Sequence, residues 1–290
     1  MRKSFILLHI SVLLAGLTGI FGKLIHLNEV LITFYRLLFS GIIMILLDLF
    51  VLKSKTKYAF PELLRLGSVG FLMGLHWIFF YGSIKYSNIS VGVVCFCLTG
   101  FFTAILGPII NRKKTSIWEI ALSFLTLFGI GLIFSFDTSY RLGILLGVIS
   151  SLFAALFTLF NEKLTRTYKA QDLIKIEMIG GTIGIGLLLP LILKFYPTDY
   201  LLPSASDFLC LLILAGLCTI LLYILVNIAL KKISAFTVNL SFNLEPIYSI
   251  IIAIVFFNEY KELNASFFIG LAIIIGSLIL QMLRVIRQSK

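Results

Sequence analysis

The chain consists of apolar stretches of about twenty residues separated by short polar links. A helix needs about 20 consecutive apolar residues to cross a hydrocarbon core of about 30 Å. The pattern therefore predicts ten membrane-spanning helices. We place them at residues 4–22, 31–51, 64–84, 89–110, 116–135, 142–162, 173–193, 207–230, 235–257 and 264–284.

The composition agrees with this pattern. Of the 290 residues, 60% are hydrophobic and 13% are charged, and the mean hydropathy is +1.08. Soluble domains are about 45–50% apolar and about 25% charged. The longest link, residues 195–206, is too short for a soluble domain. We therefore predict an all-α integral membrane protein.

The positive charges alternate from link to link, and this predicts the orientation. One set of links carries 17 Lys and Arg residues and the opposite set carries five. Because cytoplasmic links are enriched in Lys and Arg, both termini should be cytoplasmic, which requires an even number of spans. The net charge of +11 therefore indicates anionic lipid headgroups rather than nucleic acid as the partner. The richer set is Arg2, Lys3, Lys53, Lys55, Lys57, Arg65, Arg112, Lys113, Lys114, Lys163, Arg166, Lys169, Lys231, Lys232, Arg284, Arg287 and Lys290.

Ten spans divide into two halves of five, residues 1–138 and 139–290. Because five is odd, the second half would enter the membrane inverted relative to the first. Residues 84–105 align with residues 230–251 at a shift of 146, so that Thr99-Gly100 lies opposite Glu245-Pro246. Identical pairs in this alignment include Lys85 with Lys231, Phe96 with Phe242 and Leu98 with Leu244.

An ordered set of short motifs accompanies the ten spans. It comprises Phe34-Tyr35-Arg36, the turn before Asn88, Leu244-Glu245-Pro246, Asn258-Glu259 and the segment from Gly270 to Gly276. With this set the chain resembles the EamA-type branch of the drug/metabolite transporter superfamily over its whole length. The resemblance implies a bacterial inner-membrane carrier that moves small metabolites, often outward, through a central cavity between inverted halves. Where family members resemble Asn258-Glu259 late in the fourth span, this chain has Asn111-Arg112-Lys113-Lys114.

Glu245 and Pro246 lie near the middle of the ninth span. A charge at that depth costs about 2.5–3.5 kcal/mol on insertion scales, and such residues usually face a cavity or a partner. Pro246 lacks an amide hydrogen and obstructs the carbonyl of Phe242, so the helix should bend or open there. Glu245 either lines a translocation path, as a solute contact or proton acceptor, or is a buried carboxyl bonded to a neighbouring helix. Asn239 and Asn243 lie on the other polar face of this span.

Other intramembrane polar residues allow two interpretations each. Arg36 could bind a solute carboxylate, or it could reach the headgroups or hydrogen-bond helix ends. For Lys175 and Glu177 we favour interfacial anchoring and an interhelical pair over a proton relay. Asn161 and Glu162 are expected to be solvated at the end of the sixth span.

Several aromatic and amide side chains are candidates for the wall of a cavity. Aromatic rings can stack on cationic or aromatic solutes, and histidine titrates near neutral pH; packing within the membrane is the alternative for each. With Arg36 and Glu245, the candidate substrate-binding residues are Tyr35, His76, Trp77, Tyr81, Tyr223, Asn227, Asn239 and Asn243, and Glu245 and His76 are the proton-coupling candidates.

Motifs of several enzyme classes are missing from the sequence. It contains no phosphate-binding loop, no H-E-x-x-H motif and no G-x-S-x-G motif. We therefore predict no cofactor, no metal site and no enzymatic activity. The prediction is a monomeric secondary transporter in the bacterial inner membrane that exports a small metabolite by alternating access. The solute would be an amino-acid-like zwitterion or an organic cation. The alternative is a non-transporting membrane protein, such as a receptor or a lipid-modifying enzyme.

Overall fold

The computed structural model describes residues 2–53, 56–112, 114, 116–134, 140–257 and 265–288, and every regular element among them is helical. The Asn258-Glu259 motif lies outside the described residues. Asn28 and Asn88 begin helices by accepting a hydrogen bond from the backbone N–H three residues later. The elements of the first half are α1 (Arg2–Gly16), α2 (Thr18–Leu24), α3 (Glu29–Leu47), the π-helix η1 (Asp48–Leu52), α4 (Phe60–Lys85), α5 (Ile89–Phe96), α6 (Leu98–Asn111) and α7 (Ile117–Phe134).

The remaining described elements run from Arg141 to Gln288. Ser204 and Ser234 begin α10 and α12 in the same way as the two asparagines. The elements are α8 (Arg141–Leu164), α9 (Ala170–Phe195), α10 (Ala205–Ala215), the π-helix η2 (Gly216–Leu221), α11 (Leu222–Leu230), α12 (Ala235–Ser241), the 3₁₀ turn η3 (Phe242–Leu244), α13 (Glu245–Phe257) and α14 (Ala265–Gln288).

Eight helical stretches of the described chain are long and apolar enough to cross a membrane. Two shorter apolar helical stretches, Ile117–Ile133 and Ala265–Gln281, lie where the fifth and tenth spans were predicted. The protein is therefore a multi-pass, all-helical membrane protein. The eight long stretches are Lys3–Leu24, Glu29–Leu52, Phe60–Lys85, Ile89–Asn111, Arg141–Leu164, Ala170–Phe195, Ala205–Leu230 and Ala235–Phe257.

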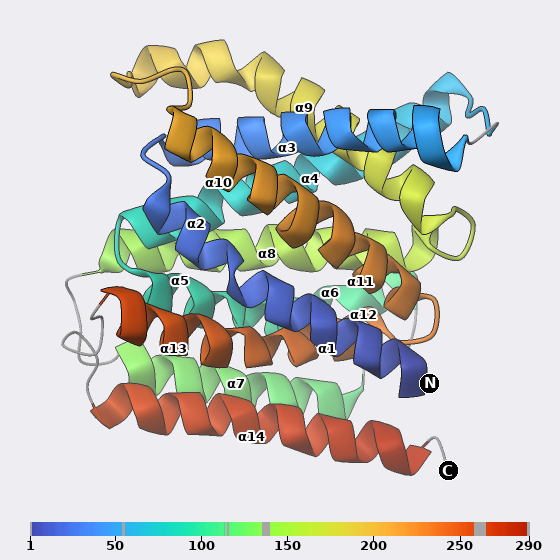
Figure 1. Ribbon diagram of the computed structural model, residues 1–290. Coiled ribbons are helices and arrows are strands. Elements are labelled where there is room, and N and C mark those ends of the chain that lie inside the picture. The colour runs from blue at the N-terminus through green and yellow to red at the C-terminus, as the bar shows by residue number, and fades with distance from the viewer. Residues whose placement is uncertain are drawn as a thin grey trace.

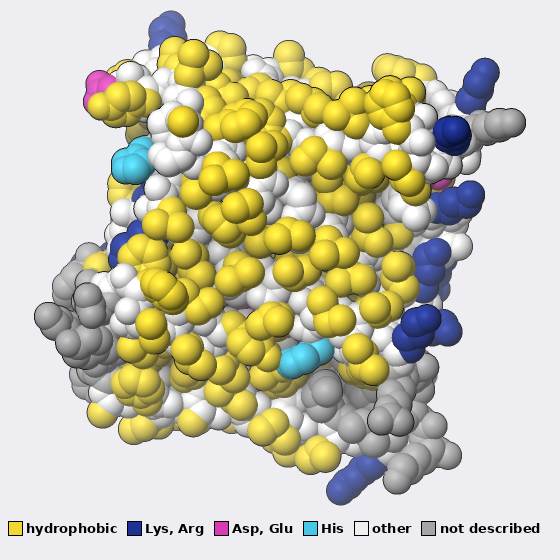
Figure 2. Space-filling model, in the orientation of Figure 1, with side chains coloured by type: hydrophobic (Ala, Val, Ile, Leu, Met, Phe, Trp, Pro, Cys, Tyr) yellow, Lys and Arg dark blue, Asp and Glu magenta, His cyan; other side chains and the backbone are white. Residues whose placement is uncertain are grey.

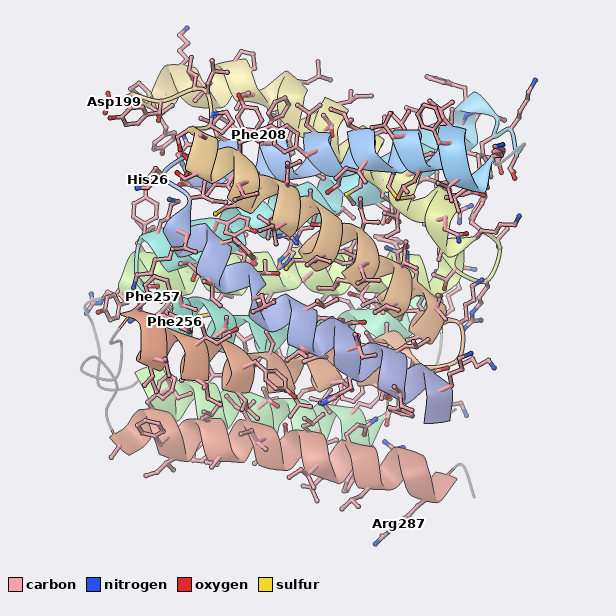
Figure 3. All side chains as sticks on the ribbon, viewed as in Figure 1. His26, Asp199, Phe208, Phe256, Phe257 and Arg287 are labelled. Atoms are coloured by element: carbon pink, nitrogen blue, oxygen red, sulfur yellow. The ribbon has the colours of Figure 1, made fainter. Side chains whose placement is uncertain are left out.

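The helices lie side by side, and the two chain ends are at the same edge of the bundle (Figure 1). Hydrophobic side chains cover the face shown in Figure 2, and many of its Lys and Arg side chains gather at the edge that holds the chain ends. His26, Asp199 and Phe257 lie toward the opposite edge, away from Arg287 (Figure 3). We call these two edges the termini edge and the opposite edge.

Four irregularities interrupt the helices near their middles. The first span breaks at Leu17, the fourth at Cys97 and the ninth at Phe242–Leu244, while the eighth contains η2. Within a bilayer, non-helical backbone is tolerated only where it is enclosed by protein or lines a cavity. At the first break, the Ser249 hydroxyl donates to the carbonyl of Gly16 at 2.8 Å.

Small residues bring α4 against α8 and α9 at the centre of the bundle. Gly67 meets Gly180, and a Cβ added at Gly70 would collide with the backbone of Glu177. On the other side of α9, Gly41 lies against Ile179. Such close approach of backbones is typical of membrane helices that associate through small residues.

Candidate functional site

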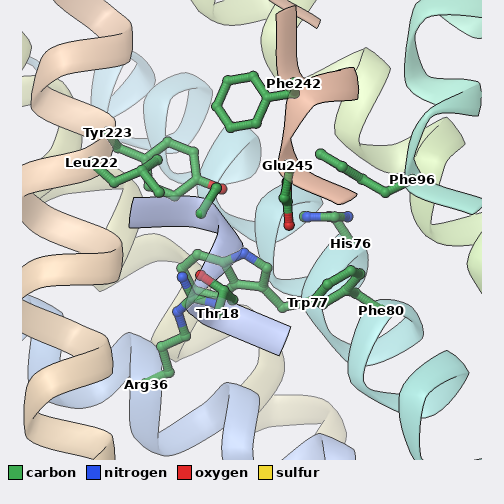
Figure 4. Close-up of a pocket in the computed structure, with 11 residues that line it drawn as sticks. Thr18, Arg36, His76, Trp77, Phe80, Phe96, Leu222, Tyr223, Phe242 and Glu245 are labelled. Atoms are coloured by element: carbon green, nitrogen blue, oxygen red, sulfur yellow. The ribbon is translucent and has the colours of Figure 1, made fainter. Parts of the chain in front are cut away.

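The four irregularities surround a cavity of about 30 Å³ near the centre of the bundle. This volume accommodates about two water molecules. Figure 4 shows that side chains from both halves of the chain line it. The lining residues are Ala15, Thr18, Arg36, His76, Trp77, Phe80, Phe96, Leu222, Tyr223, Phe242 and Glu245.

Arg36 forms one wall of this cavity and is only 1% exposed. Its Nε donates to Thr219 Oγ1 at 2.8 Å, and its two terminal nitrogens donate to Tyr81 Oη and to the carbonyl of Cys218 at 2.8 and 2.7 Å. That carbonyl lies within η2, and its bond with Arg36 ties α3 to the irregular eighth span. The guanidinium also lies 3.7 Å from the centre of the Trp77 ring, in cation–π geometry.

His76 is anchored on the α8 side of the cavity. Its Nδ1 lies 2.8 Å from Ser150 Oγ and 3.1 Å from the Ser150 carbonyl oxygen. The Ser150 hydroxyl donates in turn to the His76 carbonyl at 3.1 Å. These contacts fix the ring orientation, and Figure 4 shows the ring beside the carboxyl of Glu245.

Glu245 is the first residue of α13, directly after the 3₁₀ turn, and its carboxyl faces the cavity (Figure 4). The predicted interruption of the ninth span is confirmed, and Pro246 explains it because it has no N–H to continue the ladder. The two polar faces of this span have different surroundings. Asn239 Nδ2 donates to Thr103 Oγ1 of α6 at 2.8 Å, whereas Tyr248 contacts His9 of α1 at 3.1 Å.

The structure brings five of the ten predicted site residues to the cavity: Arg36, His76, Trp77, Tyr223 and Glu245. Tyr81 lies directly behind this group, bonded to Arg36.

The other four predicted residues lie elsewhere. Tyr35 donates a hydrogen bond to the carbonyl of Leu201 at 2.9 Å, in the link before α10. Asn239 binds Thr103, as described above. Asn227 and Asn243 are fully buried, and their side-chain polar atoms have no hydrogen-bond partner among the described residues.

The residue-level predictions missed six lining residues, which are Ala15, Thr18, Phe80, Phe96, Leu222 and Phe242. A signal for two of them was present, because Phe96 and Phe242 are identities in the internal alignment. Their rings meet edge to face across the cavity wall, with centroids 6.1 Å apart. Ring pairs of this kind stabilise a core beyond their buried area.

Of the alternatives left open for Arg36, the structure shows hydrogen bonds inside the protein, because Thr219, Tyr81 and Cys218 accept from three of its donors. Expectations for the other polar residues had different outcomes. Asn161 and Glu162 are buried rather than solvated. Lys175 pairs with Asp48 of η1. Glu177 is fully buried, but its carboxyl oxygens complete no hydrogen bond with any described residue.

Comparison with known proteins adds evidence that geometry alone does not provide. The model of the EamA-like transporter family matches the chain twice, over residues 2–135 and 141–283. The chain belongs to this family. The uncharacterized transporter YxxF of Bacillus subtilis (strain 168) is 22% identical over 284 residues, which span 97% of this chain and 89% of the relative.

Other relatives of this EamA protein match over shorter segments. GDP-fucose transporter 1 of Dictyostelium discoideum is 27% identical over 67% of this chain and 53% of its own length. An uncharacterized transporter of Haemophilus influenzae is 25% identical over 54% of each chain. A solved crystal structure shares the fold, with a TM-score of 0.69, 15% identity and 96% of each chain covered. The family and the names of the relatives indicate a transporter, not an enzyme.

Proposed function

We propose that the protein is a secondary carrier that exports a small zwitterionic metabolite, such as an amino acid, across a bacterial inner membrane by alternating access. The observation that carries this proposal is the cavity that Arg36 of the first half and Glu245 of the second half share. A cation and an acid in one enclosed site complement the carboxylate and ammonium of a zwitterion. Membership of the EamA family supports the transport class.

The chemistry of the cavity favours a solute with one charge of each sign. Arg has five N–H donors, and Arg36 uses three of them on Thr219, Tyr81 and Cys218. The remaining donors can bind a carboxylate. Glu245, which lines the same cavity as Arg36, would accept the ammonium. Phe96 and Phe242 would contact the solute side chain.

Two other solute classes are less well matched. A lipophilic cation would use Glu245 and the aromatic walls but would leave Arg36 as a like charge in the site. A nucleotide sugar, the class in the name of the Dictyostelium relative, carries several negative charges, and Arg36 is the one cationic residue that lines the described cavity. Both belong in the test panel as competitors.

The size of the cavity implies a closed state. Sites for small molecules usually have volumes of about 300–1,000 Å³, whereas this hollow measures about 30 Å³. Transport therefore requires the halves to separate around it. The breaks at Cys97 and at Phe242–Leu244 lie at aligned positions of the two halves and are the expected points of bending.

The helix contacts support two inverted repeats, residues 1–138 and 139–290, and ten spans. If α8 corresponds to α1 and α2, and α9 to α3, then α10 and α11 correspond to α4. The packing of α4 on α8 and α9 then has its counterpart in the packing of α11 on α1 and of α10 on α3. The contact of α6 with α8 likewise matches that of α13 with α1. The double match of the family model agrees with this division.

The proposal is tested with purified protein in liposomes. Uptake and efflux are measured for labelled neutral amino acids, tetraphenylphosphonium and GDP-fucose, with and without a pH gradient. We expect the amino acids to be carried and Glu245→Gln to abolish or greatly slow that transport, because the variant loses the partner of the ammonium group. Glu119→Gln on α7 is the control, because Glu119 is not among the residues that line the central cavity.

Transport of GDP-fucose or of the cation alone would overturn the zwitterion assignment. Unchanged rate and proton dependence in Glu245→Gln would remove Glu245 from the mechanism. A wild-type protein that carries none of the solutes would contradict the proposed function itself.

A further inference from the structure

A second group of buried polar side chains lies outside the central cavity. Glu177 of α9, Asn161 of α8 and Asn227 of α11 are each 0% exposed. All six of their side-chain oxygen and nitrogen atoms lack a hydrogen-bond partner among the described residues. Buried polar atoms are nearly always hydrogen-bonded, so a group of unsatisfied ones indicates an unseen occupant or a functional role.

A ring contact joins the two helices that carry the asparagines. Phe157 of α8 meets Tyr223 of α11 edge to face, with centroids 5.5 Å apart. Asn161 and Asn227 each follow one of these rings by four residues, one helical turn. Both helices run toward the termini edge (Figure 1), so each asparagine lies one turn beyond the ring contact in that direction.

Glu177 completes this cluster from the third helix. Its carboxyl lies near the side chains of Asn161 and Tyr223, and neither of its oxygens completes a hydrogen bond with a described residue. Tyr223 in turn lines the central cavity. Asn227 lies between Tyr223 and the end of α11 at Leu230. The Glu177 cluster therefore lies behind Tyr223, between the central cavity and the termini edge.

The charged and titratable groups on the neighbouring helices are engaged with other partners. None of the described ones forms an ion pair with Glu177. On α9 itself, Lys175 pairs with Asp48, and Asp172 accepts a hydrogen bond from Tyr58. On α3 and α4, Arg36 binds Thr219 and Tyr81, and His76 binds Ser150. On α8, Glu162 binds Asn111 and Arg166, and Lys163 donates to the carbonyl of Ile110.

We propose that Glu177, with Asn161 and Asn227, forms a proton-binding site that couples transport to the pH gradient. A carboxylate enclosed without a counter-charge is strongly destabilised, and a proton removes the charge without needing space. The two amides supply N–H groups that would stabilise the ionised form when the proton leaves. Ionisable residues of this kind inside membrane segments are typical of proton relays. The coupling role rests on the proposed carrier function.

Infrared spectroscopy of the purified protein in lipid tests proton binding without a transported solute. We expect wild-type protein at neutral pH to show a carbonyl stretch of a protonated carboxyl that Glu177→Gln removes and Glu245→Gln leaves in place. Glu162→Gln is the matched control, because Glu162 is also buried on α8 next to Asn161 but has Asn111 and Arg166 as partners.

A second variant guards against a change in folding. Asn161→Leu retains Glu177 but removes an amide that stabilises the ionised carboxyl. We expect the same band to persist to higher pH than in the wild type. A carboxyl band unchanged by Glu177→Gln would overturn the proposal. So would a band that NaCl removes and KCl does not at constant pH, because Na⁺ would then be the ligand.

Transport in liposomes separates this inference from the proposed function. Glu177→Gln should still exchange labelled amino acid across the membrane without a gradient, but a pH gradient should no longer drive accumulation. If Glu177→Gln keeps the wild-type response to the gradient, the coupling role is wrong and the carrier function stands. If the wild type carries none of the solutes, the carrier function fails, while the infrared result still decides whether Glu177 binds a proton.

Discussion

Arg36 combines a structural and a binding role in a single side chain. Three of its donors connect α3 to α4 and to η2, and its guanidinium stacks on Trp77. A lysine at this position would keep the charge but could not form the planar, three-way arrangement. A substitution at this position can therefore separate the contribution of the positive charge from that of the hydrogen-bond geometry.

We expect Arg36→Lys to lower the transport rate by roughly tenfold to a hundredfold, since a lost hydrogen bond to a charged group costs about 1.5–3 kcal/mol. The rate is measured with the amino acid that the wild type carries in liposomes. Arg166→Lys is the control, because Arg166 is largely exposed and pairs with Glu162 at 3.5 Å. Equal rates for Arg36→Lys and the wild type would show that charge alone suffices.

At the scale of single residues, the sequence identified part of the cavity. The cost of placing charge or a proline in the bilayer singled out Arg36 and Glu245, and both line the cavity. Apolar side chains carry no comparable cost, so nothing in their type separated Phe80 and Leu222, which line the cavity, from residues that only pack. Asn161 was misplaced because proximity to a helix end does not reveal which neighbouring helix covers it.

Among the elements, α4 and α9 have the most demanding contact. A methyl group at Gly70 would collide with the backbone of Glu177, and a backbone cannot move aside as a flexible side chain can. The distance between these helices, and with it the position of the Glu177 cluster, depends on the absence of a side chain at Gly70.

We expect Gly70→Ala to lower the free energy of unfolding by about 1–3 kcal/mol, the typical cost of overpacking. Gly131→Ala is the control, because no described atom lies within 4 Å of the added Cβ and alanine favours a helix by about 0.5–1 kcal/mol over glycine. Thermal unfolding of the two variants in the same detergent should shift in opposite directions. A Gly70→Ala protein as stable as the wild type would refute this account of the contact.

The helix breaks were predictable only where the sequence carries a chemical cause. Pro246 lacks the N–H that a continuous ninth span would need, and the interruption follows. The break at Cys97 has no proline, and only the alignment of Phe96 with Phe242 points to it. The π-helix Gly216–Leu221 left no clear pattern in the sequence, and the Arg36 side chain that binds its Cys218 carbonyl comes from a distant part of the chain.

For the whole molecule, the distribution of basic residues predicts that the termini edge faces the cytoplasm. In a cysteine-free background, Lys169→Cys and Asp199→Cys place one exposed thiol on each side. A membrane-impermeant maleimide added to intact cells should label Asp199→Cys at once and Lys169→Cys only after permeabilisation. The reverse pattern would invert the orientation and the direction assigned to transport.

The positions of the eight long apolar helices followed from the sequence because lipid imposes length and hydrophobicity on each segment separately. The packing of α4 between α8 and α9 did not, since it depends on how small residues from distant segments meet. The sequence does not specify which residues Gly67 and Gly180 pack against. The folded chain shows that they face each other.

The smallness of the central hollow has a consequence for the cell. A space for about two water molecules is far shorter than a water column through about 30 Å of hydrocarbon, and ions do not cross such a gap unaided. In this conformation the central hollow offers ions no continuous water path across the bilayer. A membrane that contains many copies of the protein in this state would therefore keep its proton-motive force.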